Sequence, residues 1–150
     1  MRSIVEHALG ELNLLAESLP AGRHIVTGDI RRISAKLYKE VKDKSINSIL
    51  PLCEELLEEH NWSLGVIAYD WAYRVRKQYT EDTYTTFYGW LKKYVHGWGD
   101  CDDFCTHAFG ELLIRYKTLF PKIKDWTKDE DFWVRRAAAV VLIPAILHND

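Results

Sequence analysis

The stretch Trp98-Gly99-Asp100-Cys101-Asp102-Asp103-Phe104-Cys105-Thr106-His107 begins a segment with helical spacing of apolar residues, and its tryptophan is part of a repeat. Three tryptophans near the starts of apolar helical runs lie 36 and 35 residues apart: Trp62, Trp98 and Trp133. Trp90 and Trp126 are also 36 residues apart. A period in the mid-thirties made of two helices is typical of HEAT-type α-solenoids.

The rest of the sequence also has helical rather than strand periodicity. The predicted helices cover residues 4–19, a segment from Thr27 to Lys44, a segment ending near His60, and residues 62–79, 81–95, 100–118, 121–127 and 130–147. Thr127-Lys128-Asp129-Glu130 matches a capping box for the last of these. We therefore predict an all-α fold, a HEAT-like solenoid forming one domain over residues 1–150, with a plain helical bundle as the alternative.

Composition places the chain among soluble globular proteins. It has 150 residues, 47% of them hydrophobic, and a net charge of −2. Three cysteines without paired spacing argue against a disulfide framework and favour a reducing compartment. The sequence lacks an apolar run of about 18 residues, which excludes a membrane span. We expect a cytoplasmic protein without a membrane partner.

One predicted helix face is basic. It carries Arg31, Arg32, Lys36, Lys39, Lys42 and Lys44 against only Glu40 and Asp43. Such a face is either solvated or directed at phosphate groups.

The quoted stretch allows two interpretations from its residues alone. Asp100 and Asp103 suit the start of a helix, where carboxylates accept backbone N–H groups, and Asp102 between them is favoured as an ionised carboxylate. Cys101 and Cys105, with His96 or His107, offer a partial metal site. A structural zinc site wants four ligands, however, and Cys53 is the one further cysteine. We predict packed thiols, no metal and no cofactor.

A third interpretation joins this stretch to Phe132-Trp133-Val134-Arg135-Arg136. The motif W-x-x-x-D from Trp98 to Asp102, followed one repeat later by W-x-x-R from Trp133 to Arg136, resembles the AlkD-like DNA alkylation repair family, the alkylpurine DNA glycosylases with HEAT-like repeats. Gly28-Asp29-Ile30-Arg31-Arg32 resembles the family's N-terminal G-x-x-x-R helix start. The resemblance runs from about residue 25 to the end.

The resemblance implies excision of purines alkylated at N3 or N7 from duplex DNA. It assigns Trp98 to the surroundings of the lesion, Asp102 to the catalytic carboxylate and Arg136 to the DNA backbone. Further expected DNA contacts are Arg135, Trp133, Arg31 and Arg32. These residue types suit the chemistry, because a carboxylate stabilises positive charge on the sugar, an aromatic face attracts a cation and arginine grips phosphate.

Three alternatives remain open at the level of sequence. Trp98 and Trp133 are packed between repeats and Arg136 forms a structural salt bridge with Asp102; the module binds DNA without catalysis; or it binds protein. The family continues for several helices beyond the arginine motif, so we expect a domain shortened at its C-terminus. The predicted last helix, from Ala137 to Leu147, is almost entirely apolar, which predicts self-association through it.

Overall fold

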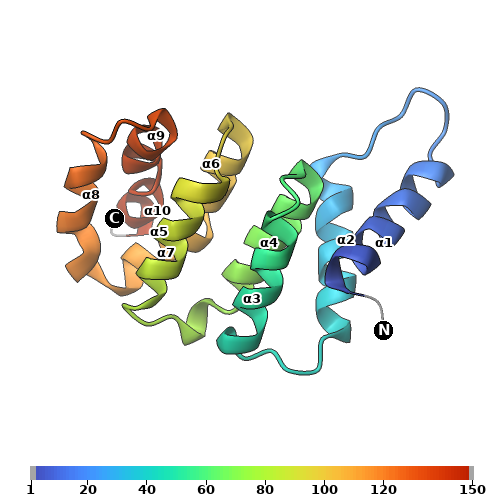
Figure 1. Cartoon of the computed structure of the whole chain (residues 1–150), viewed down its shortest axis with the longest axis horizontal. Helices are drawn as coiled ribbons and strands as arrows, with labels where there is room; N and C mark the ends of the chain where they lie inside the picture. Colours follow the sequence, from blue (N-terminus) through green and yellow to red (C-terminus); the bar gives the residue numbers. More distant parts are fainter. Residues whose placement is uncertain (1–2, 149–150) are drawn as a thin grey trace. The chain divides into compact units, whose positions relative to one another are not determined.

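The computed structural model describes residues 3–148, and every regular element in that range is a helix (Figure 1). The α-helices are α1 (Ile4–Ser18), α2 (Thr27–Glu40), α3 (Ile46–Leu57), α4 (Trp62–Arg74), α5 (Thr83–Tyr94), α6 (Trp98–Thr106), α7 (Ala108–Arg115), α8 (Phe120–Trp126), α9 (Phe132–Val140) and α10 (Ile143–His148). Two short 3₁₀ helices, η1 (Arg76–Gln78) and η2 (Lys117–Leu119), complete the set. The all-α prediction is confirmed for the described residues.

The chain divides into two compact units, residues 1–72 and 73–150. In the first unit α1 packs against α2 and α3 (Figure 1). Its core includes the fully buried indole of Trp71, whose Nε1 donates to the carbonyl of Ser34 at 3.1 Å. The buried Ser34 hydroxyl donates to Asp70 at 2.6 Å, so the polar groups that the core encloses are paired.

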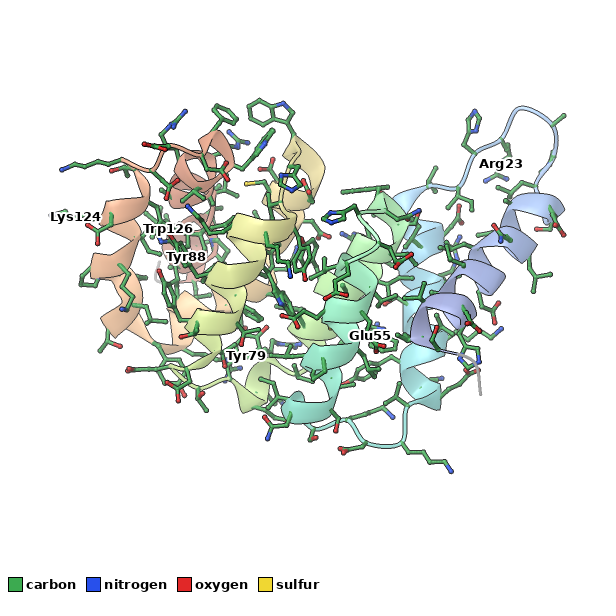
Figure 2. All side chains as sticks on the ribbon, viewed as in Figure 1. Arg23, Glu55, Tyr79, Tyr88, Lys124 and Trp126 are labelled. Carbon is green, nitrogen blue, oxygen red and sulfur yellow. The ribbon has the colours of Figure 1, made fainter. Side chains whose placement is uncertain are left out.

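The second unit is built on an aromatic core. Phe87, Trp90, Phe104 and Phe109 are fully or almost fully buried and contact one another with ring centroids 5.2–5.9 Å apart. Tyr88 and Trp126 lie side by side at its margin, with ring centroids 5.7 Å apart (Figure 2). These rings come from α5, α6, α7 and α8, so one cluster holds four helices together.

Two predicted helices are interrupted. The segment predicted as 100–118 is divided into α6 and α7 at His107, whose φ of −119° and ψ of −89° are not helical. The His107 Nδ1 lies 2.9 Å from the carbonyl oxygen of Asp103, which would accept the backbone N–H of residue 107 in a continuous helix. The imidazole thus lies against this carbonyl at the break.

The segment predicted as 130–147 is divided into α9 and α10. Pro144, the second residue of α10, has no N–H to continue the ladder of α9, and its ring would collide with the carbonyl of Val140. The helix predicted over residues 130–147 was too long because the apolar periodicity continues past Pro144.

The predicted capping box at residues 127–130 is wrong. α9 begins two residues later, where Asp131 caps it by accepting the backbone N–H of Trp133 at 2.8 Å. Thr127 instead bonds backward to the carbonyl of Lys124 at 2.7 Å, at the end of α8.

α10 exposes three large apolar side chains, Ile143, Ile146 and Leu147. Self-association through this helix stays a prediction. The last two residues of the sequence lie outside the described range. Within that range, none of the helices is both long and apolar enough to cross a membrane.

Candidate nucleic-acid interface

The first turn of α6 places an aromatic ring and a carboxylate on one face. Gly97 precedes the helix, Trp98 is its first residue and Asp102 follows four positions later, which is the spacing that brings two side chains together. The Trp98 side chain is 57% exposed, and the Asp102 carboxylate is 42% exposed. Both groups are therefore accessible from solvent.

The first turns of α9 bring a cation to the same face. α6 and α9 pack against each other (Figure 1). Arg136 of α9 contacts both carboxylate oxygens of Asp102 of α6. Nε donates to Oδ1 at 3.3 Å and Nη2 donates to Oδ2 at 3.1 Å. The hydrogen bonds to Asp102 raise the pKa of Arg136 above its ordinary value. The same guanidinium lies 4.9 Å from the centre of the Trp98 ring.

Three aromatic rings meet beside this ion pair. The ring centroid of Trp98 lies 5.4 Å from that of Phe132 and 5.2 Å from that of Trp133, both in edge-to-face geometry. Phe132 and Trp133 contact each other at 4.9 Å. We call Trp98, Phe132 and Trp133 the aromatic trio. Trp98 is 57% exposed and is therefore not a core residue, although it contacts both rings from α9. The salt bridge between Arg136 and Asp102 expected in the structural alternative is present.

The geometry thus gathers an exposed indole, a carboxylate and an arginine from two helices. A model of the DNA alkylation repair enzyme family matches residues 23–150. The chain belongs to that family. No curated protein and no solved structure matches the sequence significantly. Membership gives this protein a role in DNA repair and DNA as its substrate.

In this family member Arg135 points away from its neighbour Arg136, as consecutive positions on a helix must. Its Nη1 donates to the carbonyls of Asp129 and Glu130 at 2.7 and 3.0 Å. Its guanidinium carbon lies 5.8 Å from the centre of the Phe132 ring. Arg135 therefore holds the loop before α9 and covers one member of the aromatic trio.

Neither neighbouring aspartate is an N-cap residue. Asp100 lies inside the first turn of α6, where its Oδ2 accepts the backbone N–H of His96 at 3.1 Å and its Oδ1 that of Cys101 at 3.0 Å. Asp100 thus accepts backbone N–H groups as expected, but it does so from within the first turn and not as the N-cap residue. Asp103 lies beyond the first turn of α6, so its predicted role at the helix start is wrong. It pairs with His107, whose Nδ1 lies 3.1 Å from its Oδ1.

The cysteines are packing groups. Cys53, Cys101 and Cys105 are buried and unbridged. The Cys101 thiol lies 3.7 Å from the carbonyl oxygen of Trp133, which links α6 to α9. In the described part of the chain, no group of three or more His, Cys, Asp and Glu side chains has the geometry to hold a metal ion.

The remaining predicted DNA contacts, Arg31 and Arg32, lie on α2 in the first unit. Both are exposed, and Arg32 forms an ion pair with Asp29, whose Oδ2 accepts the N–H of Val26 at 3.0 Å. α2 begins at Thr27, which confirms the helix start predicted at Thr27-Gly28-Asp29.

Phe132 is a residue of this site that the sequence pattern does not predict. It is the first residue of α9, 45% exposed and in contact with both tryptophans of the trio. Its position in the sequence could have indicated this role. Phe132 directly follows the acidic residues 129–131 and directly precedes Trp133.

Proposed function

We propose that this protein is a DNA glycosylase that removes purines alkylated at N3 or N7 from duplex DNA by hydrolysing the N-glycosidic bond. The observation that carries the proposal is the contact of one carboxylate, Asp102, with a cation that also covers an exposed indole, Trp98. The surface is thus built to hold positive charge between an anion and an aromatic face.

The chemistry needs no proton donor. A purine alkylated at N3 or N7 is already cationic, so it leaves with the electron pair of the glycosidic bond and becomes neutral. Positive charge then develops on the sugar, and the Asp102 carboxylate stabilises it. Water attacks the anomeric carbon and loses a proton to solvent, with Asp102 orienting the water.

Arg136 takes the role of a phosphate contact in this proposal. Its guanidinium can grip a phosphate with the same pair of donors that now contact Asp102, because both partners present two oxygens. A phosphate that accepts this arginine frees the carboxylate and the face of Trp98 for the lesion. Trp133, Arg135, Arg31 and Arg32 are proposed as further DNA contacts.

We also propose a HEAT-like solenoid architecture for this protein. The helix pairs and the 35- and 36-residue spacing of the tryptophans support a HEAT-like solenoid that acts as one domain.

The decisive experiment is incubation with a methylated duplex, measuring released N3-methyladenine and N7-methylguanine. Asp102→Asn removes the charge of the proposed stabilising group and should lower the rate of release by roughly 10²- to 10³-fold, the cost of removing a preorganised electrostatic group. Asp103→Asn is the matched control, because Asp103 is the adjacent carboxylate but pairs with His107. Equal release by wild type and Asp102→Asn contradicts the assignment of Asp102. Binding of the methylated duplex by wild type without release of a base contradicts the proposed glycosylase activity.

A further inference from the structure

The orientation of Trp98 depends on its neighbours rather than on a pocket. As the first residue of α6, its indole is 57% exposed, so the core of the second unit does not enclose it. Its ring contacts the guanidinium of Arg136 on its face and the two other members of the aromatic trio in edge-to-face geometry.

Arg136 is not a lasting support if it moves to a phosphate, as the proposed function requires. The rings of Phe132 and Trp133 already contact the indole while Arg136 is in place, and they remain its supports once Arg136 has moved. The backbone of Trp133 is anchored, since its N–H bonds to the Asp131 side chain and its carbonyl lies 3.7 Å from the Cys101 thiol. Phe132 is the exposed member of the pair from α9.

Phe132 is itself held in place. Its ring contacts Trp133 at 4.9 Å, and the guanidinium of Arg135 lies 5.8 Å from its centre. That guanidinium is fixed by the carbonyls of Asp129 and Glu130. A chain of contacts therefore runs from the loop before α9, through Arg135 and Phe132, to the indole of Trp98.

An exposed phenylalanine contributes little to the core, because nearly half of its side chain stays in water. Edge-to-face contact, in contrast, fixes the angle between two rings. We propose that Phe132 is a positioning residue that holds the indole of Trp98 in the orientation needed beside the lesion. Its effect on base release rests on the proposed glycosylase function, whereas its effect on the indole does not.

The test compares three variants of the full chain with wild type. Phe132→Leu keeps an apolar side chain but removes the ring, and Phe132→Tyr restores a ring. Leu14→Ala removes an exposed apolar side chain from α1, in the other unit, and controls for loss of exposed apolar surface. The first readout is the ¹⁵N heteronuclear NOE of the Trp98 indole Nε1, assigned with Trp98→Phe, which reports motion of the ring on the nanosecond scale.

The second readout is the single-turnover rate of base release at saturating enzyme, with the Kd for undamaged duplex measured alongside. Phe132→Leu should lower the NOE of Trp98 and slow release roughly ten- to hundredfold, as misplacement of a group at the reacting centre does. Its Kd should stay within about twofold of wild type, since this contact is not a charge contact. Phe132→Tyr should recover both values, and Leu14→Ala should change neither.

An unchanged NOE of Trp98 in Phe132→Leu overturns the inference, whatever the release data show. A lowered NOE with wild-type release also overturns it, because the orientation would then have no consequence. Absence of release by wild type defeats the proposed function alone, since the NOE is measured on the free protein and still decides whether Phe132 holds the indole.

Discussion

The guanidinium of Arg136 meets both carboxylate oxygens of Asp102, at 3.3 and 3.1 Å, and lies 4.9 Å from the centre of the Trp98 ring. In the free protein a positive charge thus already lies between an anion and an aromatic face. A structural ion pair needs only the first of these contacts. The contact with the Trp98 ring adds an aromatic face, so Asp102 and Trp98 together form a cation site that the Arg136 side chain occupies in the free protein.

Gly110→Ala should destabilise the protein through a collision at α10. A Cβ at Gly110 would lie 2.5 Å from Cγ of Pro144 and 2.6 Å from the carbonyl oxygen of Cys105. Neither group can move freely, because one is a proline ring and the other is backbone. We expect a loss of about 1–3 kcal/mol in the free energy of unfolding, measured in urea.

Gly89→Ala is the matched control. Gly89 lies inside α5, and a Cβ there meets no atom within 4 Å. Alanine should therefore stabilise the protein by about 0.5–1 kcal/mol, the difference in helix propensity. A Gly110→Ala protein that is as stable as wild type would contradict the close packing of α7 on α10.

The sequence predicted the composition of the candidate site better than its surroundings. Trp98 and Asp102 were placed by a spacing of four, which any helix converts into one face. Their contact with Arg136 required the packing of α6 on α9, which the period suggests but does not determine. Asp103 was assigned wrongly because its partner, the His107 imidazole, lies at a helix break that periodicity does not reveal.

The helix boundaries failed for a related reason. Apolar periodicity continues through His107 and through Pro144, whereas the backbone hydrogen bonds do not. Phe132 was not predicted because the sequence alone does not show whether an aromatic ring at a helix start is packed or exposed.

The three thiols should be protected in the folded protein. Burial raises the pKa of the Cys53 thiol, and the hydrogen bond with Cys101, together with burial, raises that of Cys105. Thiols react as thiolates, so iodoacetamide at pH 8 should modify none of the three cysteines in the native state and all of them in urea. Mass spectrometry counts the adducts. Rapid native modification of Cys101 or Cys105 would contradict the packing of α6.

The same shifts predict a weaker fold in alkali. A thiol whose pKa is raised on folding contributes stability that is complete below its ordinary pKa of 9.0 and is lost as the pH rises from there toward the folded value. Cys53→Ala should therefore flatten the decline in melting temperature above pH 9, relative to wild type.

Asp129 should make the fold sensitive to acid. It accepts the backbone N–H of Asp131 at 2.8 Å and contacts Lys92 at 3.0 Å, and these bonds lower its pKa below the ordinary value of 3.8. A lowered carboxyl pKa contributes stability above the ordinary value that is lost as the pH falls through the folded value. Asp129→Asn should lower the melting temperature at pH 7, and the difference from wild type should shrink below pH 4.

Asp125→Asn is the control for that experiment, because Asp125 is an exposed carboxylate on the neighbouring helix α8. Its melting curve should follow wild type across the pH range. A difference between Asp129→Asn and wild type that stays constant down to pH 2 would show that the loss is not one of charge.

Substitutions of Arg136 distinguish a purely structural ion pair from a DNA contact. The pair is partly exposed, with 37% of the Arg136 side chain and 42% of the Asp102 side chain in solvent, so its loss should change the melting temperature little. Arg136→Ala should weaken binding to duplex DNA and reduce the slope of log K against log salt by about one. Arg136→Lys should restore the slope but not the full affinity, since lysine cannot form the two-pronged contact.

Asp102→Asn completes the comparison. It removes the group that holds the guanidinium, together with a negative charge beside the proposed phosphate position. We therefore expect it to bind undamaged duplex at least as tightly as wild type, while Arg136→Ala binds less tightly. If Arg136 is only structural, both variants should lower the melting temperature to a similar extent, and Arg136→Ala should leave the salt dependence of binding unchanged.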